Sequence, residues 1–191
     1  MNPYERGENW VRAVVIYFNE FDLGAAQWLR NLFPGATIDE RSIVDVQPAD
    51  IAGFQRCHFF GGIGGWEEAL RLAGWPDEWP VWTGSCPCQP LSSAGSRQGE
   101  KDERHLWPEF YRLIAECGPP IVFGEQVGGD DGYEWLDGIS IDLEDLGYAV
   151  GALDLPTASV NSPHKRQRVF WVGTGQSHSR QGGDDETQAA R

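Results

Sequence analysis

Two cysteines lie one residue apart in TGSCPCQPLSSAG, residues 83–95, flanked by prolines and followed by small, turn-forming residues. A thiolate is both a nucleophile and a metal ligand, so this pair is a candidate for chemistry. A zinc site would need two further ligands, and the chain offers no second close Cys–Cys or Cys–His pair. Burial in a core is the commoner role of a free cysteine. Packing and nucleophilic catalysis therefore both stay open for Cys86 and Cys88, and no metal is expected.

A glycine-rich turn, FFGGIGG at residues 59–65, lies between an apolar strand pattern and a helical pattern. Glycines let a ligand approach the backbone, and the start of a helix offers free N–H groups. Glu20, at the end of another expected strand, is the type of residue that binds ribose hydroxyls. Tight turns also use glycine for purely steric reasons, so both interpretations stand. Here the acidic strand precedes the glycine turn, whereas a dinucleotide site usually has the acid about 20 residues after it.

The elements that must position these groups alternate between strands and helices. Short apolar runs predict strands at residues 13–18, 36–46, 55–60, 80–84, 119–127, 148–155 and 168–173. Apolar residues at helical spacing predict helices at residues 22–33, 66–75, 106–117 and 133–147. Their expected inward faces are Ala25, Leu29, Leu32 and Phe33; Trp66, Ala69, Leu70 and Ala73; and Phe110, Leu113, Ile114 and Cys117. Such alternation predicts an α/β fold with a doubly wound, mostly parallel sheet.

Length and composition favour one domain, which we place at residues 1–173, followed by a polar tail at residues 174–191 that we expect to be disordered. The net charge of -14 argues against nonspecific adhesion to nucleic acid, so a polyanion would have to meet a local basic patch such as HKRQR, residues 164–168. Four scattered cysteines are too few for a disulfide framework. The chain shows neither a secretion signal nor an apolar run of about 20 residues. We therefore expect no membrane association and a cytoplasmic location.

The cysteine segment has a specific resemblance. PCQPLSSAG and GEKDERHLWPEFYRLI, residues 87–95 and 99–114, resemble the catalytic segment of DNA (cytosine-5)-methyltransferases. GEQV, residues 124–127, is similar to the ENV motif of that family, and PHKRQRVFWVG, residues 163–173, is similar to its PQxRxRVFIVG motif. FFGGIGG resembles the family's cofactor turn, and FNEFD, residues 18–22, resembles its acidic cofactor motif.

The resemblance implies a Rossmann-like methyltransferase fold that uses S-adenosylmethionine, with a permuted order of the first strands. It also implies transfer of a methyl group to C5 of cytosine in DNA, through a covalent cysteine–C6 adduct on a flipped base, as in restriction-modification. The family's target recognition domain has no counterpart after the last strand, so we expect either a short or loosely read target, or a homo-oligomer or separate subunit that reads the target. Two further departures are Gln126 for the motif's asparagine and Ser42 for an aspartate near the adenine, where Asp39 or Glu40 is the alternative.

The resemblance also assigns residues. It makes Cys88, and not Cys86, the nucleophile, Glu125 the partner of the cytosine N3 and amino edge, Arg168 the contact to O2, and Arg166 a nearby support. The implied cofactor-binding residues are Glu20, Phe21, Phe60, Gly62, Ile63, Gly64 and Gly65. The implied DNA-binding loop contains Gln89, Ser92, Ser93, Arg97, Lys101 and Arg104.

Two other functions stay open at this point. One is a noncatalytic DNA-binding or regulatory relative that keeps the fold without using the cofactor. The other keeps the chemistry but acts on RNA cytosine or takes a different one-carbon donor. Retention of Cys88, Glu125, Arg166 and Arg168 together argues against the first of these, and the sequence does not separate the second from a DNA methyltransferase.

Overall fold

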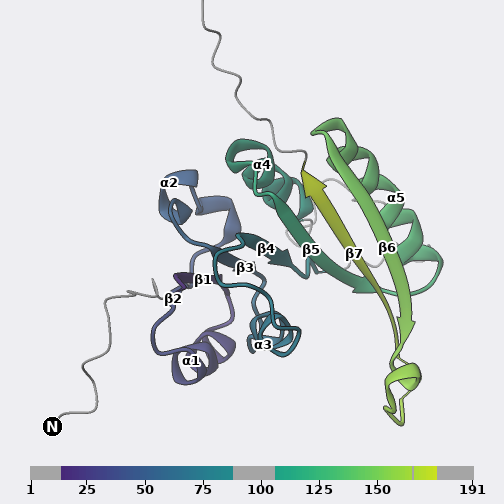
Figure 1. Cartoon of the computed structure of the whole chain (residues 1–191), viewed down its shortest axis with the longest axis horizontal. Helices are drawn as coiled ribbons and strands as arrows, with labels where there is room; N and C mark the ends of the chain where they lie inside the picture. The colour runs from purple at the N-terminus through teal and green to yellow at the C-terminus, as the bar shows by residue number, and fades with distance from the viewer. Residues whose placement is uncertain (1–13, 88–105, 165, 176–191) are drawn as a thin grey trace, which may run out of the picture.

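The computed structural model describes residues 14–87, 106–164 and 166–175. These residues contain seven strands and five α-helices (Figure 1). The strands are β1 (Ile16–Asn19), β2 (Thr37–Asp39), β3 (Arg56–Phe59), β4 (Val81–Gly84), β5 (Ile121–Val127), β6 (Tyr148–Pro156) and β7 (Gln167–Gly175). The helices are α1 (Leu23–Leu32), α2 (Pro48–Ile51), α3 (Gly65–Leu72), α4 (Trp107–Cys117) and α5 (Asp130–Asp145), with 3-10 turns η1 (Ile43–Asp45) and η2 (Thr157–Val160). No helix in these described ranges is both long and apolar enough to cross a membrane.

The strands form one sheet in the order β2-β1-β3-β4-β5-β7-β6. The first five strands are parallel, whereas β7 runs antiparallel to β5 on one side and to β6 on the other. β3, which leads into the glycine turn, lies between β1 and β4 in the sheet, although β1 comes first in the chain. The expected α/β fold is confirmed, and the permuted chain order still makes the acidic strand and the glycine-turn strand neighbours.

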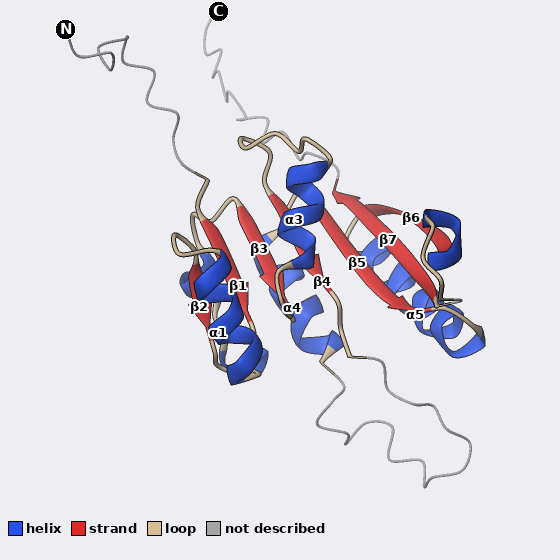
Figure 2. Cartoon of the chain, turned by 90° about the horizontal axis from the view of Figure 1, so that it is seen from below, coloured by secondary structure: helices blue, strands red, loops and turns tan. Residues whose placement is uncertain are grey.

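Helices cover both faces of the sheet. Figure 2 shows α1 and α3 on one face and α4 and α5 on the other. The core beneath α4 is aromatic: the Phe59 ring centroid lies 5.0 Å from those of both Trp82 and Phe110. Gly84, at the end of β4, permits this packing because a Cβ there would lie 2.4 Å from the Phe110 ring. The strand that leads to the cysteine pair is thus fixed against α4.

Some expected inward residues face outward. Leu32 is 52% exposed because the buried stripe of α1 runs through Ala26 and Leu29, and Cys117 is exposed on the last turn of α4. On α3, Leu70 is buried as expected, but Ala69 and Ala73 are exposed. These predictions were wrong because apolar spacing marks a helix face only approximately, and the last turn of a helix extends past its sheet.

Three chain segments also differ from the sequence prediction. The expected strand at 36–46 is a short β2 followed by η1, because Ser42 leaves the strand and caps the 3-10 turn. Helix α2 was not expected. Strand β7 continues to Gly175, two residues into the stretch assigned to the polar tail, and pairs with β6 there. The rest of that tail, residues 176–191, lies outside the described residues.

A buried polar network, which we call the Glu67 network, joins Arg56, His58, Glu67 and Thr83. Arg56 Nη1 donates to Glu67 Oε1 at 2.5 Å, and His58 Nε2 donates to Glu67 Oε2 at 3.0 Å. His58 Nδ1 lies 2.8 Å from the Thr83 hydroxyl, which can donate to it when the imidazole is neutral. All four side chains are buried, so strands β3 and β4 fix the first turn of α3 through charge and hydrogen bonds.

Acid should weaken the folded state through His58. Burial lowers the pKa of His58 below its ordinary value of 6.5, although Glu67 acts in the opposite direction. The unfolded chain therefore binds a proton more readily, and the stabilising contribution of neutral His58 is lost as pH falls below its unfolded-state pKa. We expect the free energy of unfolding to fall between about pH 7 and pH 5. Urea denaturation at a series of pH values measures this slope.

His58→Gln should reduce the dependence of the unfolding free energy on pH between about pH 7 and pH 5. This holds even if the substitution itself lowers the stability. The matched control is His164→Gln, because His164 is exposed and should leave the slope unchanged. An equal slope in wild type and His58→Gln would show that His58 does not carry the pH dependence.

Candidate active site

The carboxyl ends of the parallel strands meet at one edge of the sheet, where ligands bind in open α/β folds. β1 ends there at Asn19, directly before Glu20, and β3 ends at Phe59, directly before the glycine turn. β4 ends at Gly84 and leads through Ser85 to Cys86 and Pro87. Glu125 lies within β5, next along the sheet. The fold therefore gathers the described candidates from four strands at this edge.

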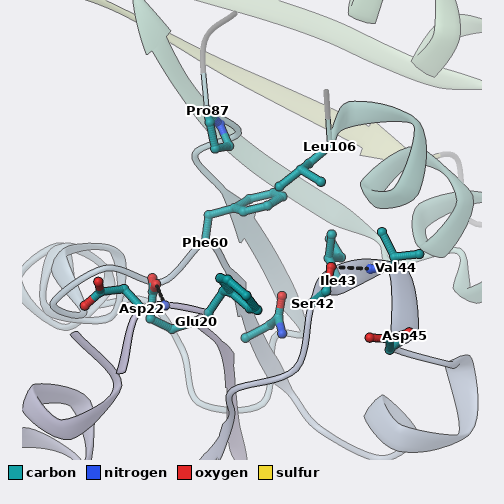
Figure 3. A pocket seen from close by; sticks show the side chains of 11 residues that line it. Glu20, Asp22, Ser42, Ile43, Val44, Asp45, Phe60, Pro87 and Leu106 are labelled. Carbon is teal, nitrogen blue, oxygen red and sulfur yellow. Dashed lines mark hydrogen bonds between the residues drawn. The ribbon is translucent and has the colours of Figure 1, made fainter. Parts of the chain in front are cut away.

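A cavity of about 730 Å³ opens at this edge. Figure 3 shows its side chains, with the Phe60 ring between Pro87 and the side of the pocket that carries Glu20. The volume is in the range of small-molecule sites. The lining combines apolar and aromatic groups with three carboxylates. Its described members are Asn19, Glu20, Phe21, Asp22, Ser42, Ile43, Val44, Asp45, Phe60, Pro87 and Leu106.

Glu20 connects the acidic motif to the glycine turn. Its Oε2 accepts a hydrogen bond from the Gly62 N–H at 2.6 Å, and its Oε1 accepts one from the Asp22 N–H at 2.8 Å. A carboxylate has about four acceptor positions, so capacity remains for hydroxyl donors in the cavity. Two backbone donors hold Glu20 in one orientation on the cavity wall.

The glycine turn is shaped by backbone and steric demands. Gly62 and Gly64 have φ values of 54° and 83°, which disfavour other residues. A Cβ on Gly64 would also lie 2.3 Å from the Phe33 ring. Phe60 takes φ 54° despite its side chain, a costly conformation that places its ring in the cavity. The turn thus serves helix packing at Gly64 and cavity shape at Phe60 and Gly62.

The expected cofactor residues divide into two groups. Glu20, Phe21 and Phe60 line the cavity, and Gly62 contacts Glu20. Ile63 is exposed, and the described cavity lining includes none of Ile63, Gly64 and Gly65. Their contribution is to form the turn.

Ser42 lines the cavity, but neither acid proposed as its alternative does so within the described lining. Arg41 binds the Asp39 carboxylate at 2.7 Å, and Arg30 binds Glu40 at 2.7 Å. Asp45, which sequence reasoning did not select, lines the cavity with Ser42. In a 3-10 turn, residues three apart lie on the same side. Had the turn been recognised from the sequence, the spacing of Ser42 and Asp45 would have predicted that both face the cavity.

The structure describes one of the two cysteines of the CPC segment, Cys86. Cys86 is buried, and burial raises the pKa of its thiol, so the thiol remains protonated at neutral pH. The buried Gln126 donates from Nε2 to the Cys86 carbonyl at 3.4 Å. Cys86 is therefore a packing residue. Cys88 lies outside the described residues, as do Gln89, Ser92, Ser93, Arg97, Lys101 and Arg104 of the predicted DNA-binding loop.

The structure brings two of the predicted catalytic side chains together. Arg168 Nε makes an ion pair with Glu125 Oε1, between the neighbouring strands β7 and β5. Arg168 also donates from Nη1 to the Gln167 carbonyl at 2.8 Å. Arg166 is exposed, and its backbone N–H and carbonyl both bond to Thr157 in the β6–β7 turn. Glu125 and Arg168 thus form a preassembled pair, and Arg166 lies on the adjacent turn.

A sequence profile described as C-5 cytosine-specific DNA methylase matches residues 12–189, nearly the whole chain. The chain belongs to this family. The match includes the strand with the acidic motif, the glycine turn, the CPC segment and the arginines of β7, so the resemblance seen in the motifs is confirmed.

Curated relatives are similar over about half of the chain. The chain is 35% identical over 108 residues to type II methyltransferase M.AplI of Arthrospira platensis, covering 56% of this chain and 30% of that protein. It is 38% identical over 96 residues to type II methyltransferase M.PspPI of Psychrobacter sp., covering 48% and 23%. The matched part of the chain thus spans less than a third of the length of these relatives.

Solved structures agree on the fold. A variant of DNMT2 from Spodoptera frugiperda superposes with a TM-score of 0.57 at 14% identity, covering 85% of this chain and 43% of that chain. S. pombe Dnmt2 methyltransferase superposes with a TM-score of 0.52 at 15% identity, covering 85% and 51%. Over 85% of its length, the chain therefore shares the fold of these two proteins.

Proposed function

We propose that this chain transfers a methyl group from S-adenosylmethionine to C5 of cytosine in DNA, with Cys88 as the covalent nucleophile. The observation that supports this most is the position of the cavity. It begins at the acidic motif and the glycine turn and ends at Pro87, the residue before Cys88. A donor held against Glu20 and Phe60 would lie beside the segment that carries the nucleophile.

The residues of the cavity fit a nucleoside donor. Glu20 has acceptor capacity for ribose hydroxyls, and Asp45 offers a carboxylate for an exocyclic amino group such as that of adenine. Phe21 is 72% exposed at the cavity wall, and its ring provides a stacking surface for a base. Phe60 and Pro87 make an apolar wall for the methionine end. When bound, S-adenosylmethionine supplies an electrophilic methyl group.

Cytosine C5 is a poor nucleophile, and Cys88 is proposed to change that. Its thiolate adds to C6, and the electrons of the C5–C6 double bond become available at C5, which can then accept a methyl group. Loss of the C5 proton re-forms the double bond and releases the thiolate. C6 cannot be reached in a stacked base pair, so the cytosine must leave the helix.

Glu125 and Arg168 are proposed to bind the flipped base. Glu125 would hydrogen-bond to N3 and the amino group and stabilise the charge that develops when the thiolate adds. Arg168 would contact O2, and its ion pair with Glu125 orients the carboxylate before the base arrives. Arg166 and the loop residues Arg97 and Lys101 would contact phosphates, which position the substrate without reading its sequence.

Methyl transfer to matched nucleic acids tests the proposal. Labelled S-adenosylmethionine is incubated with duplex DNA, single-stranded DNA and RNA of the same cytosine-containing sequences, and label in each nucleic acid is counted. We expect label in DNA. Transfer to RNA alone would assign a different substrate, and tight donor binding without transfer to any nucleic acid would favour a noncatalytic relative.

Glu20→Gln should weaken donor binding without unfolding the cavity. A hydrogen bond to a charged group contributes about 1.5–3 kcal/mol, so we expect the Kd for S-adenosylmethionine to rise about 10- to 100-fold. Isothermal titration calorimetry measures this Kd. Glu40→Gln is the matched control, because Glu40 pairs with Arg30 and is not part of the described lining. Equal Kd values for the two variants would remove Glu20 from the donor site.

A further inference from the structure

One hydrogen bond links the helix after the glycine turn to the segment that leads into Cys88. The indole Nε1 of Trp66 donates to the Ser85 hydroxyl at 3.0 Å. Trp66 is the second residue of α3, and Ser85 directly follows the last residue of β4. The bond therefore holds the backbone three residues before Cys88 from an element that is distant in the chain.

The Trp66 ring is held in place by aromatic side chains of strands β5 and β7. It stacks on Phe123 of β5, with 6.0 Å between ring centroids and an interplanar angle of 25°. It also meets Phe170 of β7 edge to face at 6.0 Å. Rotation of the indole would break both aromatic contacts, each of which favours a specific geometry. The indole N–H of Trp66 therefore points at Ser85 and does not reorient toward another acceptor.

Cys86, the residue after Ser85, is held in place as well, by a contact from β5. The Cys86 thiol is buried, and its carbonyl accepts the hydrogen bond from Gln126 of β5. Two consecutive residues are thus fixed by side chains from α3 and β5, immediately before Pro87, whose ring restricts its own backbone. The direction in which the chain leaves β4 toward Cys88 depends on these contacts.

We propose that Trp66 is a positioning residue for the nucleophile, acting through its hydrogen bond to Ser85. This inference rests on the proposed function, because it requires Cys88 to attack the base. A displacement of about 1 Å at a reacting group can cost about 100-fold in rate. Loss of the bond should therefore slow covalent attack. Donor binding should be unaffected, because the described residues that line the cavity do not include Trp66 or Ser85.

The test uses Trp66→Phe, Ser85→Ala and the double variant in the full chain. Phenylalanine keeps a ring against Phe123 and removes the N–H, and alanine removes the acceptor. The measured quantity is the first-order rate of covalent adduct formation with DNA that contains 5-fluorocytosine, in the presence of S-adenosylmethionine. We expect each single variant to react about 10- to 100-fold more slowly, with the double variant no slower than either and the donor Kd unchanged.

Trp75→Phe is the matched control. Trp75 also contacts Phe123, and its indole donates to the Trp79 carbonyl at 3.0 Å, away from the CPC segment. If Trp75→Phe slows the adduct as much as Trp66→Phe, the effect is general packing and the positioning role is wrong. An unchanged rate in Trp66→Phe, or additive losses in the double variant, overturns it as well. Absence of any adduct in wild type would instead contradict the proposed function, and the positioning role would fall with it.

Discussion

We expect Cys88→Ser to abolish methyl transfer and Cys86→Ser to retain it, when the variants are compared at equal concentrations of folded protein. The expected loss for Cys88→Ser is on the order of 10⁴-fold or more, as for other enzymes whose covalent nucleophile is removed. A serine hydroxyl has a far higher pKa than a thiol and is not ionised near neutral pH, so it does not add to C6. The measurement is transfer of labelled methyl groups to duplex DNA.

The structure makes this comparison informative because it shows the surroundings of the Cys86 thiol. Cys86 is buried, and burial raises the pKa of its thiol, which removes the thiolate that attack requires. Cys86→Ser places a hydroxyl in an apolar pocket and should lower the unfolding midpoint, a cost that leaves the chemistry intact. A Cys86→Ser variant that is fully folded and as inactive as Cys88→Ser would contradict our assignment of the nucleophile.

Glu67→Ala should cost about 3–5 kcal/mol of unfolding free energy, the range for a buried ion pair that loses one partner. Arg56 is 4% exposed, and without Glu67 Oε1 its guanidinium would keep Asp77 as its described ion-pair partner, near the surface. His58 would also lose the carboxylate bound to Nε2. The measurement is urea denaturation at neutral pH. The midpoint urea concentrations of the variants are compared after confirming that the dependence of unfolding free energy on urea concentration is the same in each.

The chain offers a control one residue away. Glu68 pairs with Arg71 on the exposed face of α3, where solvent screens the charges, so Glu68→Ala should leave the midpoint close to that of wild type. Glu67→Gln should lie between the two, because the amide can keep one hydrogen bond but not the charge. Equal midpoints for Glu67→Ala and Glu68→Ala would show that the Glu67 network does not fix α3 to the sheet.

The alternation of strands and helices and the permuted order of the first strands could both be predicted from the sequence. They depend on hydrophobic spacing and on motifs, which are local signals. The burial of Glu67 could not, since helical periodicity assigns charged residues to the solvent side. Only the approach of Arg56 and His58 from β3 makes that carboxylate stable inside.

The residues of the site also divide into those that the sequence predicted and those that it did not. Glu20 was selected by its type and its place at the end of a strand, Phe21 and Phe60 were assigned by the family resemblance, and all three line the cavity. Asp45 was missed because SIVDV was interpreted as part of a strand, in which residues three apart point to opposite faces. The choice of Cys88 over Cys86 rested on the family motif alone; the burial of Cys86 is a physical argument against Cys86 as the nucleophile, and the role of Cys88 stays a prediction.

The position of β7 between β5 and β6 restricts which changes of chain length the site can tolerate. β7 pairs along its length with β6 and over most of it with β5, and its side chains alternate between the two faces of the sheet. A one-residue slip would exchange Arg168 with Gln167 and carry the guanidinium to the face opposite Glu125. A residue inserted into the turn at 157–161 can bulge into solvent, whereas one inserted inside β7 must either break the ladder on both sides or invert the site.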